Sequence, residues 1–421
     1  MITMSVLNLQ PSLTVDPLEE AAFEKRDLAL RRRLQDIAPG LSVAATALRI
    51  WSALSHSERA SINASPHFCL WLRDFAIAHQ KSGSDLAETV ARLLSFLLAP
   101  ALREDISLGD GFYLLPDSGD RFTIFGSQVV LRTVAQAIET HRVHAAFRDG
   151  FLILRQDGGA ECYVPEVEFW AGHMANPGSG FALEKLPIEP HSGIVIDSSH
   201  RRVLAFMEDL NRNDALDREP DLRPASPSQT ELVLLSACMQ LMEAAWPEFY
   251  AEMLRSVRIV APFRSSWRRA FTNTAWQGMI FINEDFSNRC DVIDRLTHEA
   301  SHLRLNTVIS VLPLHAWGRD KTVSSPFRTG KRPVNGLYHG VFVFARVCLM
   351  LDRVARLTND MSFRAPIPTM LQSIADGVQT LRVLGGATAA GDELLNAVGA
   401  AAASLSASGS GHSDSVVVDH V

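Results

Sequence analysis

The sequence lacks the features that mark secreted, membrane-spanning and nucleic-acid-binding proteins. Only five of its 421 residues are cysteines, and they are far apart with no CxxC pair, which favours reduced thiols over a disulfide framework. No stretch approaches about 18 uninterrupted apolar residues, and the N-terminus has no basic segment followed by an apolar run. The basic residues are scattered and the formal net charge is −7, so we expect neither nucleic acid nor a membrane as a partner. A soluble, cytoplasmic protein is the expectation.

The composition does favour a well-packed protein. Hydrophobic residues make up 47% of the chain, enough to bury one large core or two to three moderate ones. The chain therefore needs neither disulfides nor a metal merely to fold. Any bound metal would therefore have a functional role and would not be needed for folding.

The hydrophobic pattern predicts an α+β fold that is mainly helical. Apolar residues recur at three- and four-residue spacing from about Leu18 to Pro100, which predicts helices. Short apolar runs bounded by turn residues, such as "RFTIF" and "GFLILRQDGG", predict strands and hairpins in the middle of the chain. We expect four regions: a helical N-terminal region at 1–105, an α+β region with hairpins at 106–205, a catalytic region with a helix-borne metal site at 206–400, and a disordered tail at 401–421.

The catalytic region has its own expected order of elements. It follows a proline- and charge-rich linker, "NRNDALDREPDLRPASPSQ". We expect one long helix over 231–257, a strand in "QGMIFIN", a helix from near Ser287, a polar loop over 318–335 and an apolar helix over 337–357. A substrate peptide could add as a strand alongside "GMIFIN", if that strand lies at the edge of its sheet.

The segment "RLTHEASHLRLNTV", residues 295–308, holds the motif HExxH. Residues four apart share one face of a helix, so His298 and His302 can direct their imidazoles at one ion. Glu299 lies beside them, near enough to act on a metal-bound water. The alternative is a buried helix with two hydrogen-bonded histidines and no metal.

Zinc peptidases are the first class that HExxH suggests, and they need a third protein ligand. One group continues as HExxHxxGxxH, but Leu305 and Val308 stand where the glycine and the third histidine belong. Another group takes a glutamate from a following helix, yet the chain has no glutamate from Ala300 to Asp392. The third ligand is therefore sought among His339, which we favour, His315, Asp320, Asp352 and Asp360.

Arginines near His339 suggest a chemistry other than that of a zinc peptidase. Arg328 and Arg332 shortly precede His339, and Arg346 follows two helical turns later on the same face. Converging arginines beside a metal suit a dicarboxylate such as 2-oxoglutarate. Three ligands leave positions open for a water on zinc, or for a co-substrate and oxygen on Fe(II). The simpler alternative for each arginine is a solvated basic loop.

The residues "THEASHLRLN", followed by "PLHAW", "SPFR", "RP" and "YHGVFVFAR", resemble a known family. It is the HExxH-motif family of 2-oxoglutarate-dependent peptide β-hydroxylases found beside ribosomally made peptide natural products (RiPP biosynthesis). The resemblance is best over about 270–350, and "SPHFCLWLRDF" upstream is similar to a recurring N-terminal segment of that family.

The resemblance implies an Fe(II) enzyme, a dioxygenase, that consumes 2-oxoglutarate and O2 and hydroxylates a side-chain β-carbon in a precursor peptide. It implies that His298, His302 and His339 bind iron and that Arg328 and Arg332 hold the 2-oxoglutarate carboxylate. Arg346 rests on helical spacing alone. Glu299 has no obvious role in such a hydroxylation, and we expect it to orient a ligand or a bound water.

Two other classes stay open from the sequence. A zinc-dependent metallopeptidase with an unusual third ligand would need Glu299 as its general base. A catalytically silent peptide-binding protein would use its histidines only for packing.

Overall fold

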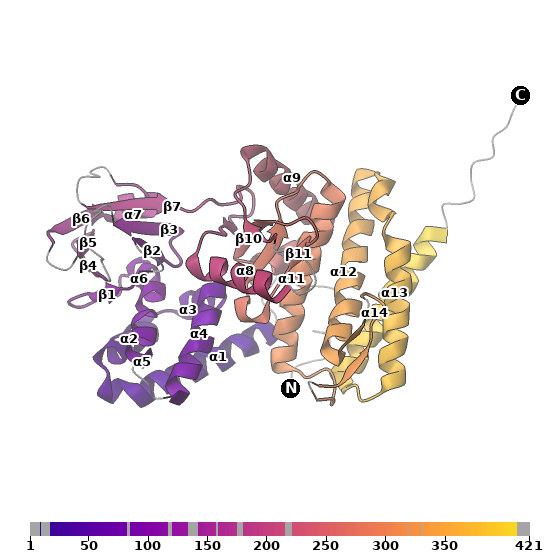
Figure 1. Ribbon diagram of the computed structural model, residues 1–421, viewed down its shortest axis with the longest axis horizontal. Helices are drawn as coiled ribbons and strands as arrows, with labels where there is room; N and C mark the ends of the chain where they lie inside the picture. Colours follow the sequence, from indigo (N-terminus) through magenta and orange to yellow (C-terminus); the bar gives the residue numbers. More distant parts are fainter. Residues whose placement is uncertain are drawn as a thin grey trace, which may run out of the picture.

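The computed structural model describes residue 9 and residues 17–81, 85–116, 120–133, 142–156, 159–174, 180–214, 221–318, 320–328 and 330–410. Helices predominate and the strands form several small sheets, so the α+β, mainly helical fold predicted from the sequence is confirmed. Figure 1 shows the two small sheets of the middle region at one end of an elongated molecule and the C-terminal helices at the other.

Six α-helices and a short 3₁₀ helix form the N-terminal part. The expected breaks are present: Pro39-Gly40 lies in the 3₁₀ helix and Pro66 begins a new helix, where its missing N–H costs nothing. The elements are α1 (Pro17–Ile37), η2 (Ala38–Gly40), α2 (Ser42–Ala53), α3 (His56–Asn63), α4 (Pro66–Lys81), α5 (Asp85–Ala91) and α6 (Leu94–Arg103).

The middle of the chain forms two antiparallel sheets with strand orders β1-β4-β5-β6 and β2-β3-β7. The elements are β1 (Phe112–Leu114), β2 (Arg121–Ile124), β3 (Val129–Thr133), β4 (Val143–Arg148), β5 (Phe151–Gln156), β6 (Glu161–Pro165), α7 (Glu166–Ala171) and β7 (Phe181–Lys185). One hydrophobic cluster joins these sheets to the N-terminal helices, with Trp51, Phe68 and Phe122 among its buried members. The helices before residue 105 and the strands after residue 106 therefore share one core.

A third sheet, in the order β11-β12-β10-β8 with β9 on β10, lies at the centre of the molecule (Figure 1). Strand β12 lies between β10 and β11, so the expectation that a peptide could add alongside "GMIFIN" as an edge strand is wrong. The elements are β8 (Val195–Ile196), α8 (Arg201–Asp214), β9 (Arg223–Pro224), β10 (Ile259–Arg264), β11 (Ala270–Phe271), η4 (Thr274–Trp276) and β12 (Met279–Asn283). Residues 211–214 of the expected linker are helical, and 215–220 lie outside the described residues.

The C-terminal half is a helical layer packed on this sheet. The elements are α9 (Gln229–Ala245), α10 (Pro247–Ser256), α11 (Arg289–Val311), β13 (Thr322–Ser324), β14 (Lys331–Pro333), α12 (Val334–Thr358), η5 (Met361–Arg364), α13 (Ile367–Leu384) and α14 (Ala389–Ser410). The single long helix expected over 231–257 is instead two helices, because Pro247 cannot donate to the preceding turn and starts α10. The loop expected over 318–335 contains the β13–β14 hairpin.

The chain is helical beyond the expected start of the tail at 401. Helix α14 continues to Ser410 and Leu405 is buried, because the alanine-rich run favours helix and packs on the core. Residues 411–421 lie outside the described residues. Among the described residues, α12 is the one helix long and apolar enough to cross a membrane, but 67% of its most apolar window is buried inside the fold. A core helix of a soluble protein has the same character.

Candidate functional site

Helix α11 carries the HExxH motif and begins where the sequence provides a cap. Asn288 accepts a hydrogen bond from the backbone N–H of Asp291 at 3.3 Å, which satisfies a free donor of the first turn. Asp291 forms ion pairs with Arg295 and Arg269 and lies near the positive end of the helix. Most residues of α11 are buried, so the motif is held in a rigid part of the core.

The structure brings together the three histidines that were expected to bind metal. His298 and His302 lie one turn apart on α11, and His339 reaches them from α12. The Nε2 atoms of His302 and His298 are 3.2 Å apart, and the Nδ1 atoms of His302 and His339 are 2.9 Å apart. We call these residues the histidine triad. All three side chains are half-buried.

The surroundings keep the histidine triad neutral. Burial lowers the pKa of His298 to about 4, with the positive charges of Arg328 and Arg269 adding to the effect. Burial alone lowers the pKa of His339 to about 4, and it holds the pKa of His302 well below its usual value. Neutral imidazole is the form that coordinates a metal ion, so protons compete weakly for this site at neutral pH.

The histidine triad has nitrogen donors that bind metal ions, and the distances between the nitrogens of its contacting rings suit two ligands on one ion. Imidazole nitrogens bind zinc at about 2.0–2.1 Å, so two ligands on one ion have nitrogens roughly 3 Å apart. His302, however, directs one ring nitrogen at each neighbour, and the three rings do not face a common point. Across the described ranges, no group of three or more histidine, cysteine, aspartate or glutamate side chains has metal-binding geometry. As placed, the rings contact one another.

Phe327 places the expected co-substrate arginine beside the triad. Its ring stacks on Phe344 with centroids 4.8 Å apart, and Phe344 lies edge-on to His298 at 5.2 Å. The phenyl ring also covers Gly340, the residue after His339. Arg328 follows Phe327 directly, and its charge acts on the pKa of His298 and of His302.

Arg332 lies close enough to Arg328 for the charge of Arg328 to affect its pKa. The pKa of Arg332 is lowered by burial and by the positive charge of Arg328. Arg328, which lies near the triad, thus has a second cation close to it, and two neighbouring cations form a suitable site for an anion.

The carboxyl group of Glu299 is engaged by a residue outside the triad. Glu299 is 3% exposed, its carboxyl group hydrogen-bonds to Thr272, and burial raises its pKa to about 8, although the positive charge of Arg328 acts to lower it. One of its oxygens, Oε2, is buried with no partner among the described residues. A buried carboxyl directed at the loop before η4 is poorly placed to activate a metal-bound water.

Arg346 and His315 make their contacts with residues outside the histidine triad. The Arg346 guanidinium is 1% exposed, donates to Glu252 at 2.6 Å and lies over the Phe249 ring. It therefore has a structural role that its helical spacing from His339 did not reveal, and its pairing with Glu252 leaves it poorly placed to bind a co-substrate. His315 Nε2 lies 2.8 Å from Asn335 Oδ1, and its ring stacks on Tyr338.

Sequence reasoning missed the residues that position the site. Phe327 and Phe344 had no assigned role, although the phenylalanine of "SPFR" and the small residue after His339 were both visible as signals. Thr272 and Arg269 come from the segment around β11, and no local pattern linked them to α11. No protein-family model matches the chain, and no curated protein is significantly similar to it.

Proposed function

We propose that this chain is an Fe(II)- and 2-oxoglutarate-dependent dioxygenase that hydroxylates a side-chain β-carbon in a ribosomally made precursor peptide. One observation carries the proposal: three neutral histidines from α11 and α12 meet beside Arg328. A neutral nitrogen donor set next to a cationic loop suits a metal whose co-substrate is an anion. The resemblance of the motifs supplies the reaction.

Each residue has a distinct part in this proposal. His298, His302 and His339 would hold Fe(II), which supplies the oxidation of 2-oxoglutarate by O2 to succinate and CO2 coupled to hydroxylation of a C–H bond. Arg328 and Arg332 would bind the distal carboxylate of 2-oxoglutarate, for which a guanidinium offers two parallel N–H donors. Phe344 packs edge-on against His298 and Phe327 stacks on Phe344, so the two rings would help to hold His298 and Arg328 in place. The peptide and O2 are the partners, and the chain would act in the cytoplasm.

The position of Glu299 makes the zinc-dependent metallopeptidase the weaker alternative. Such an enzyme needs a carboxylate next to the metal-bound water. Here the carboxyl group hydrogen-bonds to Thr272 and is buried. Hydroxylation needs no general base, so the hydrogen bond of Glu299 to Thr272 does not weigh against it.

The deciding experiment is anaerobic reconstitution of the chain with Fe(II), followed by addition of 2-oxoglutarate. Chelation of 2-oxoglutarate to Fe(II) is expected to produce a metal-to-ligand charge-transfer band in the visible spectrum. The band should be absent in His339→Ala and present in His315→Ala, since His315 lies apart from the triad. Arg328→Gln should require a higher 2-oxoglutarate concentration to reach the same absorbance. A chain that gives no band and retains zinc tightly would instead be a hydrolase.

A further inference from the structure

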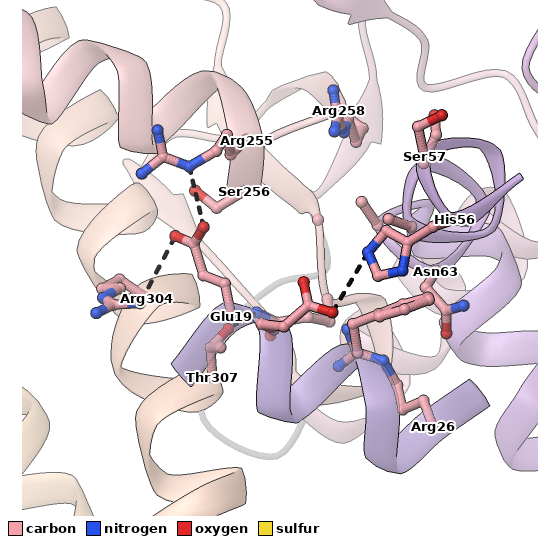
Figure 2. Close-up of a pocket in the computed structure, with 17 residues that line it drawn as sticks. Glu19, Arg26, His56, Ser57, Asn63, Arg255, Ser256, Arg258, Arg304 and Thr307 are labelled. Atoms are coloured by element: carbon pink, nitrogen blue, oxygen red, sulfur yellow. Dashed lines mark hydrogen bonds and ion pairs between the residues drawn. The ribbon is translucent and has the colours of Figure 1, made fainter. Parts of the chain in front are cut away.

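A cavity of about 410 Å³ separates the N-terminal helices from the C-terminal half (Figure 2). Residues of α1 and α3 line one side, and residues of α10 and α11 line the other. Gly278, at the turn before β12, also lines it and has φ +100; a Cβ there would lie 2.5 Å from the carbonyl oxygen of Ala64. Glycine is therefore required for this wall to come so close to the end of α3.

The charges that line this cavity do not balance. Four arginines, Arg26, Arg255, Arg258 and Arg304, face two glutamates, Glu19 and Glu20. We call this site the arginine cavity. Its fixed charge is therefore +2, from four positive and two negative groups. An excess of guanidinium groups inside a cavity attracts an anion, because low-dielectric walls strengthen the field.

The two glutamates are already engaged. Glu19 contacts Arg255 at 2.9 Å and Arg304 at 3.6 Å, as the dashed lines of Figure 2 show. Glu20 lies 3.3 Å from the Nε2 atom of His56. Arg26 and Arg258 form no ion pair with a carboxylate among the described residues, although burial lowers the pKa of Arg258 and the charge of Glu19 acts to raise it.

Arg26 and Arg258 face the cavity from different walls. Figure 2 shows Arg258 at the top of the view and Arg26 at the bottom. The Nε atom of Arg26 is buried and has no hydrogen-bond partner within the described part of the chain. A buried N–H donor without a partner destabilises the folded chain, and an anionic ligand that accepts its hydrogen bond would remove that cost.

Asn63 adds an acceptor to the same cavity. Its side chain is 2% exposed and donates to the carbonyl oxygen of Arg59 at 2.9 Å. Its Oδ1 atom is buried, with no donor to it among the described residues. A ligand that satisfies both Asn63 and the arginines must carry a negative charge and a hydrogen-bond donor. An acidic peptide supplies both in one chain, with carboxylates for the arginines and a backbone N–H for Asn63, whereas sulfate supplies only the charge.

We propose that the arginine cavity binds an acidic segment of a peptide, with Arg26 and Arg258 holding carboxylate oxygens and Asn63 accepting an N–H. The proposal rests on the proposed function in one respect: the bound peptide is the substrate of the histidine triad. The cavity itself is distinct from the triad. Arg304 and Thr307 line it, whereas His302 is directed at His339 on α12.

The distance between the arginine cavity and the histidine triad sets a minimum spacing within the bound peptide. Helix α11 lies between the cavity and the triad, and a helix with its side chains is about 10 Å across. An extended chain advances about 3.3 Å per residue. The acidic anchor must therefore lie at least about three residues from the residue that is modified.

The test measures binding directly and does not depend on activity. A fluorescein-labelled tetraglutamate peptide is titrated with the full-length chain by fluorescence anisotropy, alongside a tetraglutamine peptide of the same design. Arg26→Gln and Arg258→Gln should each weaken tetraglutamate binding about tenfold or more, as expected for a lost charge-assisted hydrogen bond. Arg258→Lys keeps the charge and should weaken it less. The matched control is Arg32→Gln, an exposed residue of α1 outside the cavity.

The outcomes separate this proposal from the proposed function. Equal binding of tetraglutamate and tetraglutamine, or unchanged binding in both glutamine variants with an intact fold, would overturn it. Saturable binding of inorganic phosphate without binding of tetraglutamate would also overturn it, since the site would then be a simple anion site. Tetraglutamate binding in a chain that forms no complex of Fe(II) and 2-oxoglutarate would support the arginine cavity and remove only the proposed function.

Discussion

The ring of Phe327 lies directly against the backbone of Gly340. A Cβ atom added at Gly340 would come within 2.4 Å of Phe327 Cδ2, closer than side chains approach in folded proteins. Gly377 on α13 borders the same ring, with its own would-be Cβ 3.2 Å from Phe327 Cε2. Two glycines on neighbouring helices thus form the slot that fixes Phe327, and Arg328 beyond it.

Gly340→Ala should weaken the binding of 2-oxoglutarate by moving Phe327 out of this slot. Overpacking a tight contact costs about 1–3 kcal/mol, which offsets the gain of about 1 kcal/mol that alanine brings to a helix interior. We expect the concentration of 2-oxoglutarate that half-saturates the Fe(II) complex to rise severalfold. Titration of the visible band measures it.

The matched control for this substitution is Gly399→Ala in α14. A Cβ at Gly399 would meet only the Nη2 atom of Arg382, at 3.9 Å, so the alanine should stabilise the helix without cost. Equal 2-oxoglutarate affinity in Gly340→Ala and Gly399→Ala would show that Phe327 does not position Arg328.

Replacing His302 should abolish metal binding, because only two of the three proposed ligands would remain. His302 is the one member of the triad that contacts both others, at 3.2 Å and 2.9 Å. We expect His302→Ala to retain less than a tenth of the Fe(II) bound by the unmodified chain, measured by elemental analysis after desalting. His315→Ala should retain the full amount, and equal loss of iron in the two variants would contradict the assignment of the triad.

The helical spacing of the sequence was sufficient to predict the triad but not the place of Arg346. Residues four apart on α11 share a face in any helix, and His339 was the downstream histidine next to a small residue. The same spacing argument failed for Arg346, because periodicity tells which face a residue occupies and not which element covers that face. Helix α10 covers it and supplies Glu252, which pairs with the guanidinium.

Long-range packing explains the other differences. Strands of the middle region share one core with Trp51 and Phe68 of the N-terminal helices, and contacts this distant leave no local pattern in the sequence. Pro247 within the helical pattern indicated a break, but the long apolar run on both sides of it favoured one continuous helix. Thr272, which holds Glu299, likewise lies 27 positions earlier in the chain.

Glu299→Gln should leave 2-oxoglutarate consumption largely intact. Glutamine has the same shape and can keep a hydrogen bond to Thr272, so metal content and stability should change little. A metallopeptidase would lose its general base and with it about 10²-fold or more of its activity. The measurement is succinate formation by the two proteins under matched Fe(II) loading, with zinc-loaded protein assayed for peptide cleavage in parallel. A loss of succinate formation of that size with metal still bound would contradict the oxygenase assignment.

Acid should destabilise the protein in part through His67, on α4. Its ring is buried against His200 at 4.1 Å, Phe125 at 5.1 Å and Trp276 at 5.4 Å. Burial holds the pKa of His67 well below 6.5, and the charges of His200, Arg202 and Arg121 act in the same direction. Asp197 and Asp74 pair with Arg121 and Arg202 respectively, so neither carboxylate is free to stabilise a protonated His67.

The sign of the pH effect follows from proton uptake. Below about pH 6.5 the unfolded chain binds a proton at His67 that the folded chain does not, so the free energy of unfolding falls as the pH falls, by up to about 1.4 kcal/mol per pH unit. His67→Phe removes this contribution, and it sacrifices no hydrogen bond at Nδ1, which is buried without a partner among the described residues. The triad histidines contribute equally to both proteins, so they cancel in the difference. Urea unfolding at pH 7.5, 6.5 and 5.5 should therefore show His67→Phe gaining stability relative to the unmodified chain as the pH falls, whereas a constant difference would mean that the pKa of His67 is the same in the folded and unfolded chains.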